Sequence, residues 1–155
     1  MDPDQISANL KTKRVGKKIL VYRSTSSTND VAAEYGKSGE NDGLVVFAEE
    51  QTAGRGRAGR KWESGRADSI LCSIVLADSV PQHHLLSLAC AVAVAEAIGP
   101  AGAASHARIK WPNDILLNGK KVAGILLESK AGRCGGFCIV GIGINCHQQP
   151  DSFPD

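Results

Sequence analysis

The stretch ILLNGKKVAGILLESKAGRCGGFCIVGIGINC, residues 115–146, decides the fold because it reads as three β-strands in succession. Asn118-Gly119 lies between apolar runs and is the typical signal of a hairpin with a type I′ turn. KAGRCGG (130–136) predicts a second turn, and FCIVGIGINC (137–146) predicts the third strand. Three consecutive strands predict an antiparallel sheet at this end of the chain.

Both strands and helices are predicted in the residues before this sheet. Ser27 begins a short helix, 27–36, in which Asp30 completes a capping-box pattern and Gly36 is the expected stop. A longer helix rich in Ala and Leu is predicted at 81–99, and further strands at 18–25, 42–51, 69–78 and 107–114, the last stopped by Pro112. The predicted fold class is therefore α/β or α+β, with a mixed sheet flanked by helices.

The composition is that of an ordinary globular domain. The chain has 155 residues, of which 43% are hydrophobic, and this suits a single domain with an apolar core. Lys and Arg number 18 against 16 Asp and Glu, so the net charge of +2 does not predict a global polyanion binder. The cysteines form no CxxC pair and favour buried thiols in a reducing compartment. Without an apolar leader or a membrane-spanning stretch, we expect a cytoplasmic protein with no membrane partner.

The loop GRGRAGRKW, residues 54–62, concentrates positive charge on a flexible backbone between two predicted strands. Glycines let the backbone approach a ligand closely, and arginine matches phosphate and carboxylate oxygens, so the loop predicts binding of an anionic small molecule. It has neither the P-loop pattern nor the Rossmann pattern, so a nucleotide would be held in another way. Non-specific nucleic-acid binding is the alternative, and a strong salt dependence would be its signature.

Two polar residues near the predicted hairpin also point to a cleft. Lys121 shares one face of its predicted strand with Ala123 and Ile125, which predicts that the lysine points towards a cavity. Asn145 ends an otherwise apolar strand, where a buried amide needs hydrogen-bond partners. With the basic loop, these residues predict a cleft for an anionic or phosphate-bearing ligand.

Five motifs, taken in their order along the chain, closely resemble those of the biotin protein ligases, also called holocarboxylase synthetases. They are STND (27–30), EEQTAGRGRAGRKW (49–62), KWPND (110–114), GKKVAGILLE (119–128) and GIGIN (141–145). The resemblance implies the catalytic-core fold related to class II aminoacyl-tRNA synthetases and lipoate ligases. It also implies that the chain activates biotin with MgATP to biotinyl-5′-adenylate. Biotin would then pass to one lysine of a biotin carboxyl carrier protein domain of acetyl-CoA carboxylase or a related carboxylase.

The same resemblance implies residue roles. Arg57, Lys121 and Asp114 are implied to be catalytic, with Asp114 acting through Mg²⁺. The residues implied to bind biotin are Ser27, Thr28, Asn29, Gln51, Gly54, Arg55, Arg57, Lys121 and Gly124. Those implied to bind the nucleotide are Arg57, Arg60, Trp62, Lys110, Asn113, Asp114 and Asn145. The glycine loop is expected to fold over biotin and the phosphate and to keep water from the adenylate.

The ends of the chain differ from the family pattern. Family members continue well beyond GIGIN into an SH3-like domain, so we expect residues 18–155 to form a C-terminally truncated catalytic domain. Residues 1–17 are expected to be a short polar extension without a DNA-binding helix-turn-helix, and no DNA partner is expected. A homodimer is compatible with the resemblance, because some members pair through sheet edges. Two alternatives stay open, namely a lipoate or octanoate transferase and an inactive module that holds biotin or its adenylate.

Overall fold

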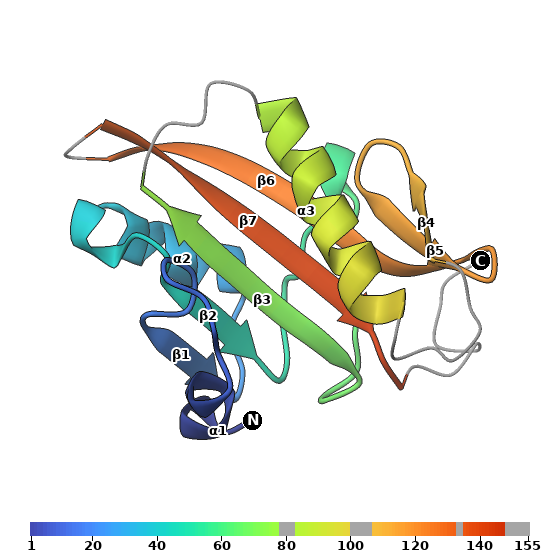
Figure 1. The fold of residues 1–155 in the computed structure, drawn as a ribbon, viewed down its shortest axis with the longest axis horizontal. Helices are drawn as coiled ribbons and strands as arrows, with labels where there is room; N and C mark the ends of the chain where they lie inside the picture. The colour runs from blue at the N-terminus through green and yellow to red at the C-terminus, as the bar shows by residue number, and fades with distance from the viewer. Residues whose placement is uncertain (78–82, 100–106, 133–134, 148–155) are drawn as a thin grey trace.

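A single mixed sheet carries the fold. The computed structural model of the chain describes residues 1–77, 83–99, 107–132 and 135–147. Its seven strands lie in the order β1-β2-β3-β7-β6-β5-β4 (Figure 1). Their bounds are β1 Ile19–Tyr22, β2 Val45–Ala48, β3 Ser69–Leu76, β4 Ala107–Lys110, β5 Asp114–Leu117, β6 Lys120–Gly132 and β7 Gly135–Asn145. The helices are α1 Pro3–Ala8, α2 Thr28–Gly36 and α3 His83–Ile98, with short 3-10 turns η1 Gly39–Asn41 and η2 Arg57–Gly59.

The predicted antiparallel meander is confirmed. Strands β5, β6 and β7 follow one another and pair antiparallel, whereas β1 and β2 pair parallel. Asn118 and Gly119 both have positive φ, 52° and 79°, as a type I′ turn requires. The pairing of β6 with β7 continues to Gly132 and Gly135, so these strands extend further than the sequence predicts. The predicted fold class, a mixed sheet flanked by helices, is also confirmed.

Different helices cover the two faces of the sheet. Figure 1 shows α3 crossing in front of β3, β7 and β6. Ala91 of this helix and Val140 of β7 belong to one buried cluster between the helix and the sheet. Phe137 and Ile139, which point the opposite way from Val140, pack with Ala32 of α2 in a second cluster. The strand periodicity of two therefore divides the molecule into an α3 face and an α2 face.

Helix α2 begins as predicted and ends differently. Ser27 is its N-cap, and the Ser27 hydroxyl accepts a hydrogen bond from the backbone N–H of Asn29. Gly36 was expected to lie just beyond the helix, but it is the last helical residue and Lys37 is the C-cap. A Cβ at Gly36 would come within 2.3 Å of the Phe137 ring, so packing explains this glycine.

Two further helices complete the fold. The α3 sequence HHLLSLACAVAVAEAI is apolar nearly all round, as expected for a helix that lies on a sheet, and residues 81–82 of the predicted helix lie outside the described residues. Helix α1 was not predicted from the sequence; Asp2 caps it and Pro3 occupies its first turn. Within the described ranges, no helix is both long and apolar enough to cross a membrane.

The predicted face of Lys121 is wrong, although its side chain lines a cavity as predicted. Ile115 pairs with Ala123, but the next residue of β5, Leu116, pairs with Lys121, so Val122 is an extra residue in the ladder. Such a β-bulge breaks the alternation of side chains. Lys121 therefore shares the α2 face with Gly124 and does not join Ala123 beneath α3.

Candidate functional site

Three glycines leave the centre of the α2 face without side chains. Gly124 of β6 lies opposite Gly143 of β7, and Gly141 lies opposite Leu126. An added Cβ at Gly143 would come within 2.5 Å of the Trp62 indole, and one at Gly141 within 2.4 Å of Asn29 Oδ1. Side chains from outside the sheet therefore approach its backbone directly. We call Gly124, Gly141 and Gly143 the glycine floor.

The Trp62 indole occupies part of this floor. A Cβ at Gly124 would lie 2.9 Å from Trp62, and the Lys121 ammonium lies 5.6 Å from the ring centroid. Trp62 Nε1 is buried and has no hydrogen-bond partner among the described residues. The cavity over the floor measures about 100 Å³. Since ligand clefts usually hold roughly 300–1,000 Å³, Trp62 must move before a ligand of ordinary size can lie on the floor.

A buried polar network forms one wall of the cavity. The Thr28 backbone N–H and hydroxyl both donate to Gln51 Oε1, at 2.7 and 3.0 Å. The Ser73 hydroxyl lies 2.6 Å from Asn29 Oδ1 and 2.7 Å from Thr28 Oγ1. Thr28, Asn29 and Gln51 line the cavity, and the buried Ser73 lies behind them; we call these four residues the polar wall. Because its members are uncharged and bonded to one another, the wall suits a neutral ligand group that exchanges hydrogen bonds.

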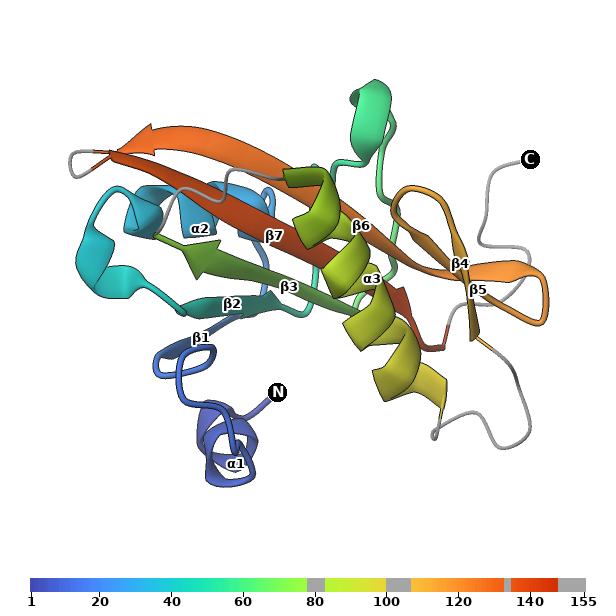
Figure 2. The ribbon, with the colours of Figure 1, turned by 45° about the horizontal axis from the view of Figure 1, so that its top comes forward.

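The glycine loop, residues 54–62, is a small hairpin. The Trp62 N–H donates to Gly54 O at 3.0 Å, and the Gly56 N–H donates to Arg60 O at 2.6 Å. A Cβ at Gly54 would meet the Trp62 carbonyl oxygen at 2.4 Å, so only glycine fits this close crossing of two backbones. The tip, η2, stands beside the turn that joins β4 to β5 (Figure 2).

Arg55 at the base of the loop is held by two carboxylates. Asp30 of α2 accepts two hydrogen bonds from the Arg55 guanidinium, at 2.6 and 3.0 Å. Glu128 of β6 lies 3.5 Å from the same guanidinium. The hydrogen bond from Arg55 holds the pKa of the Asp30 carboxyl below its usual value, and Asp30 in turn raises the pKa of Arg55.

Two further cations that line the cavity, Lys121 and Arg57, lie at its other end. Lys121 Nζ lies 2.8 Å from Asp114 Oδ1. The Arg57 guanidinium is 3.4 Å from Asn113 Oδ1, which is a long hydrogen bond. Asn113 is itself fixed by two hydrogen bonds of 2.9 Å to Ile125. Its side-chain N–H₂ donates to the Ile125 carbonyl, and its backbone carbonyl accepts from the Ile125 N–H. The cavity thus has a neutral polar end and a cationic end.

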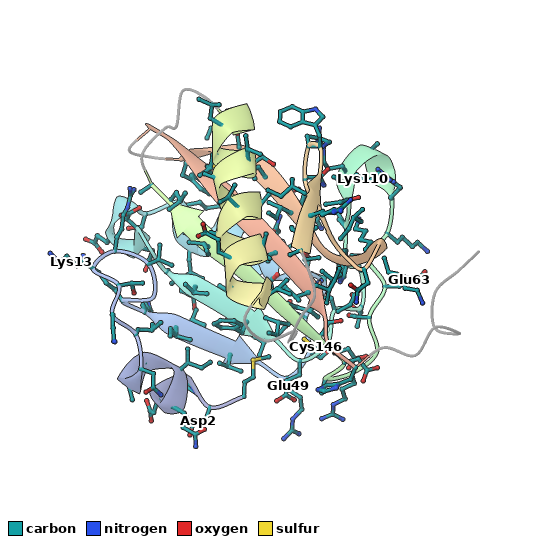
Figure 3. The ribbon with its side chains drawn as sticks, turned by 45° about the vertical axis from the view of Figure 1, so that its right-hand side comes forward. Asp2, Lys13, Glu49, Glu63, Lys110 and Cys146 are labelled. Carbon is teal, nitrogen blue, oxygen red and sulfur yellow. The ribbon has the colours of Figure 1, made fainter. Side chains whose placement is uncertain are left out.

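Most of the sequence-predicted site residues come together. The sequence-predicted residues that line the cavity are Ser27, Thr28, Asn29, Gln51, Arg55, Arg57, Arg60, Trp62, Asn113, Asp114, Lys121 and Gly124. Lys110 and Asn145 do not line it, and Gly54 lines the larger groove outside the loop. Asn145 Nδ2 reaches Lys121 O at 3.5 Å, while its Oδ1 is buried without a partner in the described part of the chain. In Figure 3, Lys110 lies on the same side of the molecule as Glu63, which follows the loop.

Sequence reasoning missed three residues of the site. Ser73 was treated as part of an apolar strand, although a hydroxyl on a buried strand is a signal of a polar partner. Asp30 was assigned only to a capping box and to the STND motif, and Glu128 only to the GKKVAGILLE motif. Trp111 of the KWPND motif is 65% exposed and lines the larger groove outside the loop, which measures about 1200 Å³.

The acidic residues offer little for a resident metal. Within the described ranges, no group of three His, Cys, Asp or Glu side chains comes together. Asp114 is the one carboxylate among the described residues that line the cavity, and it is paired with Lys121. Mg²⁺ is commonly bound by one or two carboxylates together with substrate phosphates. The donor set therefore fits a Mg²⁺ ion that arrives with a nucleotide.

Comparisons with known proteins agree with this geometry. Residues 21–145 match the family model described as the biotin/lipoate A/B protein ligase family. The chain is 40% identical to the bifunctional ligase/repressor BirA of Bacillus subtilis, over all of this chain and 48% of that protein. It is 42% identical to the biotin–acetyl-CoA-carboxylase ligase of Mycobacterium tuberculosis, over 87% of this chain and 52% of that protein. The chain thus spans about half the length of these curated relatives.

Solved structures with the same fold carry ligands. The biotin protein ligase from Aquifex aeolicus in complex with biotin and ATP superposes with a TM-score of 0.71 at 30% identity, over 90% of this chain and 56% of that chain. The biotin protein ligase from Leishmania major in complex with biotinyl-5-AMP gives a TM-score of 0.67 at 31% identity, over 90% of this chain and 62% of that chain.

Proposed function

Because the chain belongs to the biotin/lipoate A/B protein ligase family, we propose that it is the biotin-activating part of a biotin protein ligase. Its substrates are biotin and ATP, and its product is biotinyl-5′-adenylate. The biotinyl group then passes to a lysine of a carboxyl carrier domain. These assignments are proposals for this chain, since it spans about half of its curated relatives.

One observation carries the proposal: the cavity joins a neutral polar wall to a cationic end across a floor without side chains. Biotin has the matching form, with a neutral ureido head group, an apolar ring and chain, and a carboxylate. Thr28 and Gln51 of the polar wall would exchange hydrogen bonds with the head group, and the glycine floor would leave room for the fused ring system. The carboxylate would lie near Lys121 and Arg57.

The chemistry follows from this placement. A carboxylate oxygen of biotin forms a bond to the α-phosphorus of ATP, the bond from that phosphorus to the bridging oxygen breaks, and pyrophosphate leaves. Two anions must approach each other, so the site has to supply positive charge and orientation. Lys121 is paired with Asp114 at 2.8 Å, and we expect the lysine to turn from this carboxylate to the reacting oxygens. Asp114 would then hold Mg²⁺, which neutralises phosphate charge.

Closure of the glycine loop protects the product. The adenylate is a mixed anhydride that water hydrolyses, so a loop that covers it prevents loss of the activated group. Trp62 and Arg57 both belong to this loop, and a ligand that displaces Trp62 from the floor would reorder it. In the second step the carrier lysine nitrogen attacks the acyl carbon, and AMP leaves. The described cysteines are free thiols, which suits the cytoplasmic location that we also propose.

The test is an exchange assay on the purified chain. We would incubate it with biotin, MgATP and an apo carrier domain, and follow both labelled pyrophosphate exchange and the carrier mass. Exchange together with a biotin-sized mass gain supports the full proposal. Exchange without transfer limits this chain to activation, and biotin binding without exchange limits it to a binding module. Lipoate and octanoate, offered as the alternative acids, must support no exchange; preference for either acid would overturn the assignment of biotin.

Lys121 provides the sharpest variant. Lys121→Ala should lower pyrophosphate exchange by about 100-fold, the scale for removing one transition-state charge partner, while biotin affinity measured by calorimetry falls much less. Lys120→Ala is the matched control, because Lys120 is the exposed neighbour on the same strand and does not line the cavity. A defect confined to biotin binding would refute the role given to Lys121.

A further inference from the structure

The two carboxylates beside Arg55 come from elements far apart in the chain. Asp30 lies in the first turn of α2, and Glu128 lies on β6. Asp30 makes the bidentate contact that matches a guanidinium fork, and Glu128 approaches Arg55 Nη2 at 3.5 Å. We call Asp30 and Glu128 the acidic clamp. Neither residue lines the cavity over the glycine floor.

The acidic clamp is anchored in rigid structure. The Ser26 hydroxyl donates to Asp30 Oδ2 at 3.0 Å, and the Asn29 amide donates to Glu128 Oε2 at 2.9 Å. Asn29 is buried and also bonded to the Ser73 hydroxyl of the central strand β3. Arg55 is therefore held by groups that the sheet and helix α2 fix in place.

The position of Arg55 makes this contact important for the whole loop. Arg55 pairs with Lys61 at the base of the loop hairpin, between the Gly54–Trp62 and Gly56–Arg60 contacts. Fixing its side chain fixes the direction in which the hairpin leaves the protein. At the tip, by contrast, Arg57 contacts the rest of the site through its long hydrogen bond to Asn113.

We propose that Asp30 and Glu128 are positioning residues that clamp Arg55 and so hold the glycine loop over the ligand cavity. This inference rests on the proposed function for its effect on biotin, but its effect on the loop is independent of any ligand. A loop already aligned at its base loses less conformational freedom when it closes. The tip remains free to move, while the backbone at the base is held and only the side chain of Trp62 leaves the floor.

The first test measures the loop alone. Trypsin cleaves after arginine and lysine, so the rate of cutting within residues 54–62 reports how often the loop opens. Asp30→Asn should raise this rate about two- to fivefold, the range expected for losing an exposed ion pair. Glu34→Gln is the matched control, since Glu34 is an acid of the same helix that pairs with Lys37, whereas Arg55 pairs with Asp30 and Glu128. Equal cutting rates in both variants would overturn the proposal.

A second variant separates the clamp from a general effect of Asp30 on helix α2, since an acid in the first turn also stabilises the helix. In an Arg55→Ala background the clamp has nothing to hold, so adding Asp30→Asn should leave the cutting rate unchanged. A further increase in the double variant would show that Asp30 acts through the helix and would refute the clamp. Urea midpoints for all variants must stay close together, and cutting at the loop is compared with cutting outside it to exclude global unfolding.

The third measurement links the clamp to ligand binding. In the exchange assay, Asp30→Asn and Glu128→Gln should each raise the KM for biotin about two- to fivefold with a smaller change in kcat. Asp30→Glu should recover part of the loss, because it restores the charge. If the parent chain is active and these variants match it, the clamp is wrong. If the parent chain is inactive, the proposed function fails and the trypsin result still decides the clamp.

Discussion

Gly141 lets the side chain of Asn29 lie directly on strand β7, and Gly141→Ala tests how firmly Asn29 is held there. An added Cβ would lie 2.4 Å from Asn29 Oδ1 and 3.1 Å from Asn29 Cγ. Asn29 cannot move away easily, because its amide bonds the Ser73 hydroxyl at 2.6 Å and the Glu128 carboxylate at 2.9 Å. The substitution must therefore break these two hydrogen bonds and overpack the space between the strand and Asn29.

The cost follows from three terms. Two broken hydrogen bonds contribute about 1 kcal/mol each, and overpacking a buried site contributes about 2 kcal/mol. Alanine leaves the unfolded chain less conformational freedom than glycine does, and this raises the free energy of unfolding by about 0.5–1 kcal/mol. We expect Gly141→Ala to lower the free energy of unfolding by about 3 kcal/mol. The assay is urea denaturation of the purified variants with a common slope.

Gly136→Ala is the matched control on the same strand. The nearest atom to its added Cβ is Lys130 O at 3.7 Å, which is ordinary contact. This variant should keep or slightly raise the free energy of unfolding, by about 0.5 kcal/mol. If Gly141→Ala and Gly136→Ala unfold within about 1 kcal/mol of each other, then Asn29 is not held as described and the reasoning is refuted.

Two further predictions concern the floor and the acid dependence. Gly143→Ala places its Cβ 2.5 Å from the Trp62 indole, which belongs to a loop that can move, so the variant should unfold within about 1 kcal/mol of the parent yet bind biotin at least tenfold more weakly. Tryptophan fluorescence should shift to the red as Trp62 leaves the floor; an unchanged spectrum with unchanged affinity would contradict this. The Arg55 hydrogen bond lowers the pKa of Asp30 below its ordinary 3.8, so the stability that this contact adds is fully present above pH 3.8 and disappears as the pH falls through the lowered pKa. The difference in urea midpoint between the parent and Asp30→Asn should accordingly be constant above about pH 5 and shrink in more acidic buffer, and a difference that grows there would show the wrong sign.

The sequence by itself determined the features that depend on neighbouring residues. The type I′ turn at Asn118 and Gly119, the N-cap at Ser27 and the succession of three strands all follow from local backbone preferences. The family motifs also lie in the sequence, and the match of residues 21–145 to the family bears out that resemblance. The predicted end of helix α2 was less accurate. Gly36 was expected beyond the helix because glycine commonly ends helices, but it lies in the helix and is explained by its contact with Phe137, which only the tertiary structure brings about.

The tertiary structure alone decided which side chains share the site. The extra residue at Val122 turns Lys121 to the α2 face, and period-two alternation cannot reveal a bulge whose cause is the pairing of two strands. The contacts of Arg55 with Asp30 and Glu128 join residues that are distant in the chain, so no local pattern contains them. These contacts form only when the register of the strands and the packing of α2 on the sheet have brought the partners together.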